Sequence, residues 1–185
     1  MSSIDRRETA HLVLTRLRSD DFDDLHRLHS DPRVMATLGG SRSRNETQRV
    51  FDGLLADWRS DGFGYWLARD RHTGHFAGRG GLRRVMIAER PAVEVGYAVC
   101  SEFWGRGLAT ELADESARAA FAELALDGLV AFTLPTNRAS RRVMEKVGFT
   151  LLGEIAWAEL PHVLYGLSAT DWRRRRTDPS RGPRA

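Results

Sequence analysis

The most informative segment of the chain runs Glu94-Val-Gly-Tyr-Ala-Val-Cys-Ser-Glu-Phe-Trp-Gly-Arg-Gly-Leu-Ala-Thr-Glu111. Its apolar beginning predicts a strand over 93–99, and the periodicity after Gly107 predicts an amphipathic helix over 108–126. Gly105 and Gly107 allow a tight turn between the two. The first N–H groups of a helix have no partner within the helix, and the helix dipole favours negative charge there. The segment therefore predicts a cradle for a pyrophosphate.

Two common phosphate motifs do not fit this turn. No Lys-Ser/Thr pair follows Gly107, so the turn is not a P-loop, and the third glycine of the dinucleotide fingerprint is missing. On spacing alone, a phosphate cradle and a plain strand-to-helix connection remain equally open.

Strands and helices are expected to alternate on both sides of this segment. The order is strand, helices, three strands, helix, strand, helix and two strands, which predicts an α/β fold with a mixed sheet. A length of 185 residues without an internal repeat or linker fits one domain. The other expected strands cover 12–17, 65–69, 76–87, 129–134, 149–155 and 162–168, and the other helices lie near 22–28, 32–38, 50–58 and 139–147.

Composition narrows the classes of protein. The hydrophobic fraction of 42% and the charged fraction of 29% suit a globular domain. No apolar run approaches the roughly 20 residues of a membrane helix, and the polar N-terminus lacks a signal-peptide core. The chain is therefore expected to be soluble and cytoplasmic. Cys100 is the single cysteine, and the histidines show no metal-ligand spacing, so we expect neither a disulfide nor a metal site.

Positive charge is concentrated at the C-terminus. The net charge is +3, and residues 171–185 contribute +4 through six arginines and two aspartates, which leaves −1 for the rest. We expect residues 173–185 to form a basic, disordered tail behind a domain over 9–172. Because the excess lies in the tail, a nucleic-acid-binding function carried by Arg173–Arg176 is the weaker alternative, and it predicts binding that falls steeply with salt.

A second informative block lies about 30 residues after the glycine turn. It consists of Leu134-Pro-Thr-Asn-Arg-Ala-Ser140 and then Val143-Met-Glu-Lys-Val-Gly-Phe149. Together the two blocks resemble the GNAT superfamily of acetyl-CoA-dependent N-acetyltransferases, and within it the branch of the ribosomal-protein N-terminal acetyltransferases. The resemblance covers roughly residues 9–172 and includes Leu12–Leu17, Ser30–Met35, Gly62–Trp66 and Thr73–Gly78.

The resemblance implies a GNAT-like fold, in which a mixed central sheet splays around the cofactor and is flanked by helices. Trp104 stands where the family usually has Gln or Arg, so one side-chain contact to phosphate is expected to be missing. The implied acetyl-CoA contacts are the backbone of Ala98, Val99 and Cys100 for the pantetheine arm, Arg106, Gly107, Ala109 and Thr110 for the pyrophosphate, and Asn137 for the pantetheine or an ordered water.

Acetyl transfer to an amine requires a proton acceptor and is helped by a proton donor for the leaving thiolate. Glu94 is the candidate base, directly or through a water, because family members often carry a carboxylate at this strand; a surface carboxylate is the equal alternative. Ser140 is the candidate acid, because its counterpart in the branch lies near the CoA sulfur. A serine in the first turn of a helix is also often a local capping group.

Several other residues have weaker claims to a role. His162 and Tyr165 lie on a strand expected to border the acceptor site. Cys100 suggests an acyl-cysteine intermediate, but no histidine lies near it in the sequence and buried cysteines usually serve packing. The aromatic residues Trp58, Phe63, Tyr65 and Trp66 are expected in the core rather than in an acceptor pocket.

These inferences predict an enzyme, an N-acetyltransferase that moves the acetyl group of acetyl-CoA to a primary amine by direct attack. The acceptor is a peptide or protein N-terminus or a small amine, and the oligomeric state is open, with a homodimer as one option. The alternative is a non-catalytic acyl-CoA-binding module, which would share the cradle but would need no base at Glu94.

Overall fold

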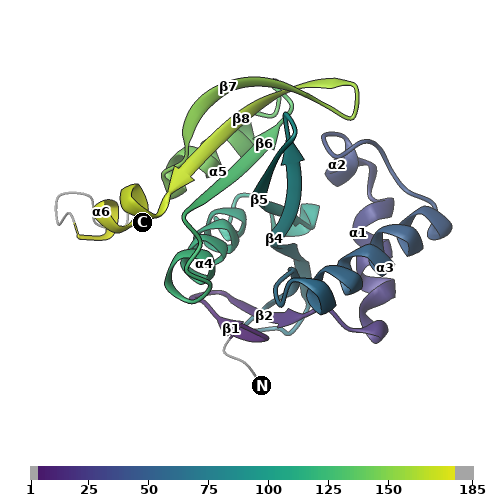
Figure 1. The fold of residues 1–185 in the computed structure, drawn as a ribbon. Helices are drawn as coiled ribbons and strands as arrows, with labels where there is room; N and C mark the ends of the chain where they lie inside the picture. Colours follow the sequence, from purple (N-terminus) through teal and green to yellow (C-terminus); the bar gives the residue numbers. More distant parts are fainter. Residues whose placement is uncertain (1–3, 178–185) are drawn as a thin grey trace.

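A computed structural model describes residues 4–177 of the chain (Figure 1). Its strands form one mixed sheet in the order β1-β2-β3-β4-β5-β6-β8-β7, in which β5 and β6 are parallel and the other neighbours antiparallel. This confirms the predicted α/β class. The strands are β1 (Arg6–Glu8), β2 (Leu12–Arg16), β3 (Tyr65–Asp70), β4 (Phe76–Ile87), β5 (Arg90–Val99), β6 (Gly128–Thr133), β7 (Thr150–Trp157) and β8 (Leu160–Ser168).

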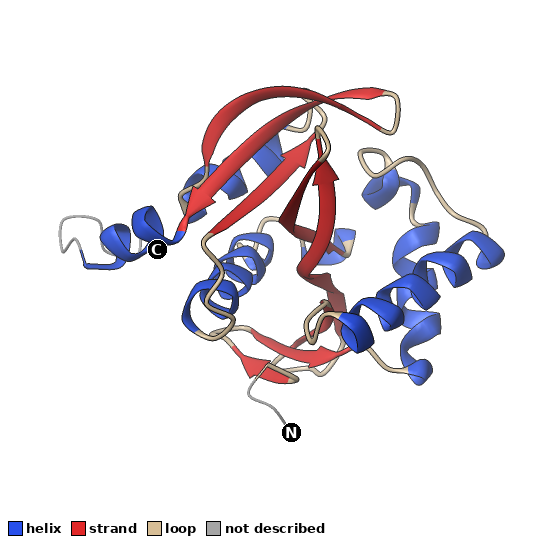
Figure 2. Cartoon of the chain, in the orientation of Figure 1, coloured by secondary structure: helices blue, strands red, loops and turns tan. Residues whose placement is uncertain are grey.

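Helices cover both faces of the sheet (Figure 2). On one side lie α1 (Phe22–Ser30), α2 (Pro32–Met35) and α3 (Arg44–Ser60), and on the other lie α4 (Leu108–Ala122) and α5 (Arg138–Val147). The last helix, α6 (Ala169–Thr177), follows β8. None of the helices within residues 4–177 combines the length and apolarity that a membrane crossing requires.

The face of the sheet that packs against α4 is set by a glycine in β4. A Cβ at Gly80 would lie 2.4 Å from Leu112 of α4, so only glycine lets this helix approach the strand so closely. Because side chains alternate across a strand, Arg79 and Arg83 lie on the opposite face of β4. Their partners in β5 are Ala98 and Glu94, which therefore share that opposite face.

The sheet opens between β5 and β6. β4 and β5 pair over their whole length, whereas β5 and β6 pair at Glu94 and Val130. Beyond that point β6, β8 and β7 turn away from β5, as Figure 1 shows. The backbone of β5 around Tyr97 and Val99 consequently borders the opening. The expected splayed sheet is confirmed. The opening begins beside Glu94, where the pairing of β5 with β6 ends.

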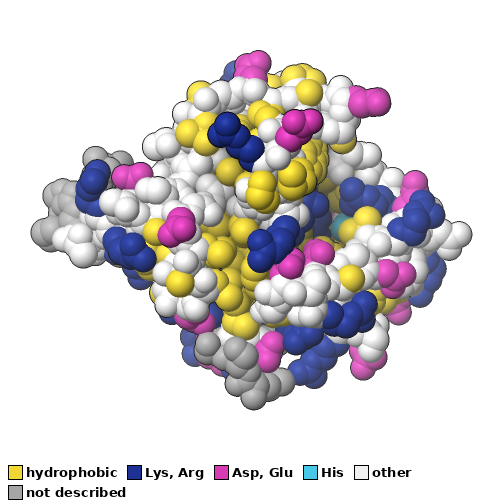
Figure 3. All heavy atoms as spheres, viewed as in Figure 1, with side chains coloured by type: hydrophobic (Ala, Val, Ile, Leu, Met, Phe, Trp, Pro, Cys, Tyr) yellow, Lys and Arg dark blue, Asp and Glu magenta, His cyan; other side chains and the backbone are white. Residues whose placement is uncertain are grey.

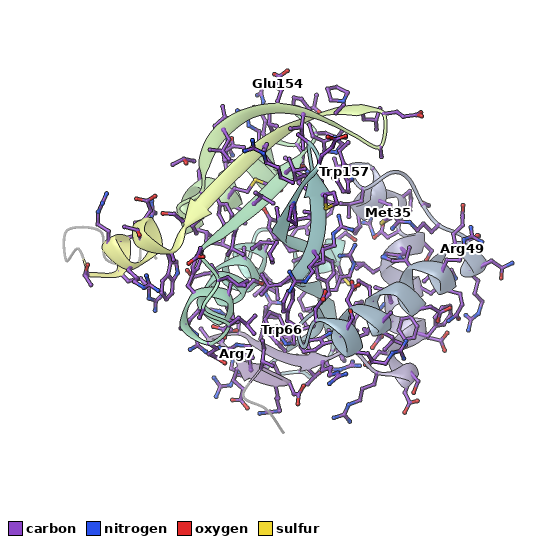
Figure 4. The ribbon with its side chains drawn as sticks, viewed as in Figure 1. Arg7, Met35, Arg49, Trp66, Glu154 and Trp157 are labelled. Carbon is purple, nitrogen blue, oxygen red and sulfur yellow. The ribbon has the colours of Figure 1, made fainter. Side chains whose placement is uncertain are left out.

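Both ends of the described chain are more ordered than the sequence predicts. β1 precedes the predicted domain start at residue 9, and Arg7 forms a buried ion pair with Glu115 of α4 and a partly buried one with Glu123, the residue that follows this helix. Figure 4 shows Arg7 beside Trp66 at this end of the molecule. At the other end, α6 includes residues 173–177, for which the sequence predicts disorder. The remaining tail, 178–185, lies outside the described residues.

The ordering of α6 has a local cause. The Trp172 ring packs against Phe121 of α4 with a centroid distance of 5.4 Å. Arg175 donates to the Lys146 carbonyl at 3.2 Å, and Arg176 lies 3.7 Å from Asp114. Part of the arginine run is therefore engaged within the protein, which weakens the case for a free basic arm.

Candidate active site

A cavity of about 730 Å³ lies where the sheet opens. It extends from the start of α4, along β5, to the end of β7 and the start of β8 and to the loop after α2. Figure 3 shows a hollow between the β6–β8 part of the molecule and helices α1–α3, and Figure 4 places Trp157, one of its lining residues, beneath β7. The predicted site residues that line it are Glu94, Ala98, Val99, Gly107, Ala109, Thr110, Asn137 and Ser140.

The start of α4 has the features of a phosphate cradle. Gly107 is its N-cap residue, with a φ of +79°, and no side chain caps this end. A Cβ added at Gly105 or Gly107 would meet no atom within 4 Å, so the space in front of the helix is open. Unpaired N–H groups, the positive end of the dipole and open space together suit a pyrophosphate. The residues present therefore fit this part of CoA.

Arg106 differs from the expectation. The sequence predicts that its side chain adds a positive charge beside the pyrophosphate, whereas Nη2 donates to Asp70 Oδ2 at 2.8 Å. Asp70 is buried at the end of β3, and the Arg106 guanidinium also stacks on the Phe103 ring at 5.1 Å. Arg106 does not line the cavity. Its side chain therefore ties the glycine turn to β3 in this structure.

Fewer backbone groups of β5 face the opening than the sequence predicts. The Cys100 N–H donates to the Ala77 carbonyl of β4 at 2.8 Å, and by alternation the backbone groups of Ala98 also face β4. The backbone groups of Val99 point toward the opening, but its carbonyl already accepts from the Trp104 indole at 2.8 Å. Of the three residues expected to pair with the pantetheine, only Val99 therefore offers a backbone group, its N–H, to the opening.

Cys100 is buried and does not line the cavity. Burial raises the pKa of the Cys100 thiol to about 12, so the nucleophilic thiolate is scarce at neutral pH. We expect Cys100→Ser to keep kcat within about twofold of the wild type, because a packing role does not need the sulfur. Steady-state assays with and without iodoacetamide check this. A loss of more than tenfold in the folded variant would restore the acyl-cysteine hypothesis.

Asn137 has a structural task at the start of α5. Its Oδ1 accepts from the Ser140 N–H at 3.1 Å and so caps α5. Its Nδ2 donates to Thr133 Oγ1 at 3.0 Å and to Thr37 Oγ1 at 3.1 Å. Both amide protons are thus used, and what Asn137 can offer a ligand is the second lone pair of its oxygen.

Ser140 has a hydroxyl partner that sequence reasoning missed. Tyr97 lies on the α4 face of β5, and its hydroxyl lies 3.0 Å from Ser140 Oγ and 3.1 Å from the Ser140 carbonyl oxygen. Burial raises the pKa of Tyr97, so the phenol keeps its proton. Both residues line the cavity. The alternation of β5 already placed Tyr97 beside the opening, but only the fold shows that α5 carries Ser140 to it.

Glu94 is not a surface carboxylate. It is buried, lines the cavity and forms an ion pair with Arg83 Nε. Burial opposes the charge of Arg83, but Tyr65 and Glu94 more than offset it, and the pKa of Arg83 is raised. Arg83 also lies over the Trp157 ring, at 5.9 Å from its centroid. The carboxylate is thus held by one residue on the strand next to it.

The weaker candidates divide between the cavity and the core. His162 lines the cavity, and its Nδ1 lies 3.0 Å from the Leu160 carbonyl oxygen. Tyr165 is buried away from the cavity and donates to Glu145 at 3.0 Å. Tyr65 lines the cavity, whereas the other aromatic residues of that group pack in the core as predicted: Trp58, Phe63 and Trp66.

Comparisons with known proteins agree with this geometry. A family model described as an acetyltransferase (GNAT) domain matches residues 11–150. The FsC-acetyl coenzyme A-N(2)-transacetylase of Aspergillus fumigatus is 34% identical over 151 residues, which are 77% of this chain and 63% of that protein. An acetyltransferase structure from Agrobacterium tumefaciens is 30% identical, with a TM-score of 0.77 over 90% of this chain and 96% of that one.

The ribosomal-protein-S5-alanine acetyltransferase of Vibrio fischeri has the same fold. Its TM-score is 0.72, with 21% identity over 90% of this chain and 98% of that chain. The matched domain covers most of the described chain and includes the glycine turn, the strand with Glu94 and the helix with Ser140. The chain belongs to the GNAT family of acetyltransferases.

Proposed function

We propose that the chain transfers the acetyl group of acetyl-CoA to the nitrogen of a primary amine. The observation that carries the proposal is one continuous cavity, which joins the open start of α4 to the buried carboxylate of Glu94. A CoA-binding module would need the first of these features but not the second. The relative from Aspergillus fumigatus, whose name describes an N(2)-transacetylase, also supports transfer to nitrogen.

Each end of the cavity has a separate task in this proposal. The N–H groups of Gly107, Leu108 and Ala109 bind the pyrophosphate, since the Thr110 N–H donates to the Gly107 carbonyl at 3.0 Å, and the N–H of Val99 orients the pantetheine. Acetyl-CoA, when bound, supplies a thioester carbonyl. Glu94 accepts a proton from the acceptor ammonium, directly or through a water, and the amine nitrogen then bonds to the acetyl carbon as the C–S bond breaks. Tyr97 or Ser140 donates the proton that the departing sulfur takes up, and the second proton that the nitrogen loses as the amide forms restores that hydroxyl.

A screen for thiol release from acetyl-CoA tests the proposal. Peptides with free N-termini, amino acids, amino-acid amides and spermidine are offered in turn. The loops at the acceptor end bring arginines rather than carboxylates, so we expect amino-acid-like amines to exceed spermidine in kcat/KM. Acetyl-CoA binding without release of CoA by any amine would favour the non-catalytic alternative.

The hydroxyl pair gives a further expected result. Ser140→Ala and Tyr97→Phe should each lower kcat by up to about 10²-fold, with little change in the affinity for acetyl-CoA, because each removes a proton donor for the leaving sulfur. Ser116→Ala is the matched control, since this serine is buried in α4 and donates to the Leu112 carbonyl. If neither Ser140→Ala nor Tyr97→Phe slowed turnover, the pair would have only a structural role.

A further inference from the structure

The acceptor end of the cavity carries more positive than negative side chains. Arg42, Arg79 and Arg83 line it, and within residues 4–177 Glu94 is its single acidic lining residue. Arg83 is accounted for by its ion pair with Glu94. Arg33, which also lines the cavity, is paired with Asp31 at 3.0 Å. The guanidinium groups of Arg42 and Arg79 are therefore the ones, among the arginines that line the cavity, for which no ion pair is seen within residues 4–177.

These two guanidinium groups lack counter-charges among the described residues. No carboxylate within residues 4–177 lies at ion-pair distance from either one, and Arg79 Nε and Arg42 Nη1 are buried without a hydrogen-bond acceptor in that part of the chain. Arg42 Nη2 donates to the Leu38 carbonyl at 3.1 Å, and Arg79 stacks over the Tyr65 ring at 4.8 Å. A buried donor left without an acceptor costs free energy, and residues 4–177 supply no acceptor for these two nitrogens.

The surroundings add little negative charge. Burial lowers the pKa of Arg79 and the neighbouring arginines lower it further, while Tyr65 and Glu94 oppose this, and the pKa remains lowered. Burial, together with the charges of Arg79 and Arg42, lowers the pKa of His29 to about 3, so this side chain is neutral. Glu46 is near Arg42, but its carboxylate accepts from the Ser43 N–H and hydroxyl at the start of α3.

This pair is distinct from the CoA cradle. Gly80 faces α4, so its neighbour Arg79 projects from the opposite face of β4. The cradle lies at the start of α4, whereas Arg42 belongs to the loop between α2 and α3 on the other side of the sheet. The pair shares its face with Glu94, the candidate base, so it borders the place of the acceptor amine.

We propose that Arg79 and Arg42 bind an anionic oxygen group, a carboxylate or a phosphate, that is carried by the acceptor amine. This rests on the proposed function, since it assigns the class of acceptor to the same cavity. A guanidinium fork matches either anion with two parallel hydrogen bonds. The anion would be held at the arginines while the amine faces Glu94, which orients the nitrogen for attack.

Matched acceptors test this inference in the intact enzyme. Phenylalanine is compared with phenylalaninamide, and phosphoethanolamine with ethanolamine, so that each pair differs in the anionic group. We expect the charged member of at least one pair to lose about tenfold or more in kcat/KM in Arg79→Met and Arg42→Met, mainly through KM, while the neutral member changes little. Comparing variant with wild type cancels the different basicities of the amines.

Two more variants separate the subsite from general damage. Arg79→Lys keeps the positive charge but not the guanidinium fork. It should reverse part of the rise in KM for the charged acceptor that Arg79→Met causes. Arg84→Met is the matched control on the same strand, because Arg84 is exposed, pairs with Asp61 at 3.0 Å and lies outside the cavity. Equal effects of Arg79→Met on charged and neutral acceptors would overturn the inference.

A binding measurement distinguishes failure of the inference from failure of the proposed function. Phenylacetate and phenyl phosphate, which lack an amine, are titrated calorimetrically into CoA-saturated protein. We expect at least one to bind, and Arg79→Met to weaken it about tenfold. If the anions bound in this way but no amine were acetylated, the anion subsite would be supported and the acetyl-transfer proposal would be contradicted. Absence of binding, or equal binding by Arg79→Met, would overturn the subsite.

Discussion

Glu94→Gln is expected to lower kcat by about 10²–10⁴-fold and to leave the affinity for acetyl-CoA nearly unchanged. Glutamine keeps the shape of the side chain and can still accept a hydrogen bond from Arg83, but it cannot take a proton from the ammonium. The deficit should shrink as the pH rises, because more of the acceptor amine is then already neutral. Steady-state kinetics from about pH 6 to pH 10 with one amine measure this.

The variant Arg83→Met distinguishes two roles of Glu94, that of the catalytic base and that of an ion-pair partner that holds Arg83. It removes the partner of Glu94 but keeps the carboxylate, so we expect a smaller loss and no convergence with the wild type at high pH. If both variants lost the same activity at every pH, Glu94 would serve to hold Arg83. A loss below threefold in Glu94→Gln would exclude it as the base.

Gly107→Val is expected to raise the Kd for acetyl-CoA by about 10²-fold or more. The valine side chain would project into the open space in front of α4, where the phosphate must approach two or three N–H groups, and each charge-assisted bond is worth about 1.5–3 kcal/mol. The left-handed φ of +79° adds strain of about 1–3 kcal/mol for a residue with a Cβ. Calorimetric titration of acetyl-CoA measures the change.

Gly62→Val controls for that strain. Gly62 has a φ of +72°, a Cβ there would also meet no atom within 4 Å, and it lies outside the cavity. Both variants should therefore lose similar stability, visible as a lower Tm, whereas Gly107→Val alone should lose affinity. If acetyl-CoA bound equally well to both, the start of α4 would not be the cradle.

The sequence predicted the class of fold because apolar residues recur at helical or strand spacing in most elements. The helix predicted over 108–126 is α4, Leu108–Ala122, and the glycine turn before it lies as predicted. Helices with one apolar face and strands between turn residues follow from local sequence, which tertiary packing did not override here. The family resemblance, carried by spaced motifs, was confirmed by the matched domain.

The starts of β5 and β8 were predicted too late in the chain, because the turns that precede them have an unusual sequence. β4 and β5 are joined by Ala88 and Glu89, with φ of +46° and +62°, and β7 and β8 by Ala158 and Glu159, with φ of +47° and +64°. Such two-residue turns normally carry Asn and Gly. Because Ala-Glu gives no turn signal, β5 was expected to begin near residue 93 rather than at Arg90, and β8 near residue 162 rather than at Leu160.

By itself the sequence predicted the α/β class and the glycine turn before α4, because each depends on residues close together in the chain, and the family resemblance pointed to Glu94 and Ser140 as candidates. Only the tertiary structure decided which partner each side chain has. It paired Arg106 with Asp70, joined Tyr97 to Ser140 and left Arg79 Nε without an acceptor among the described residues. These pairings join residues that are distant in sequence, and strand order and helix packing determine them, which periodicity does not encode.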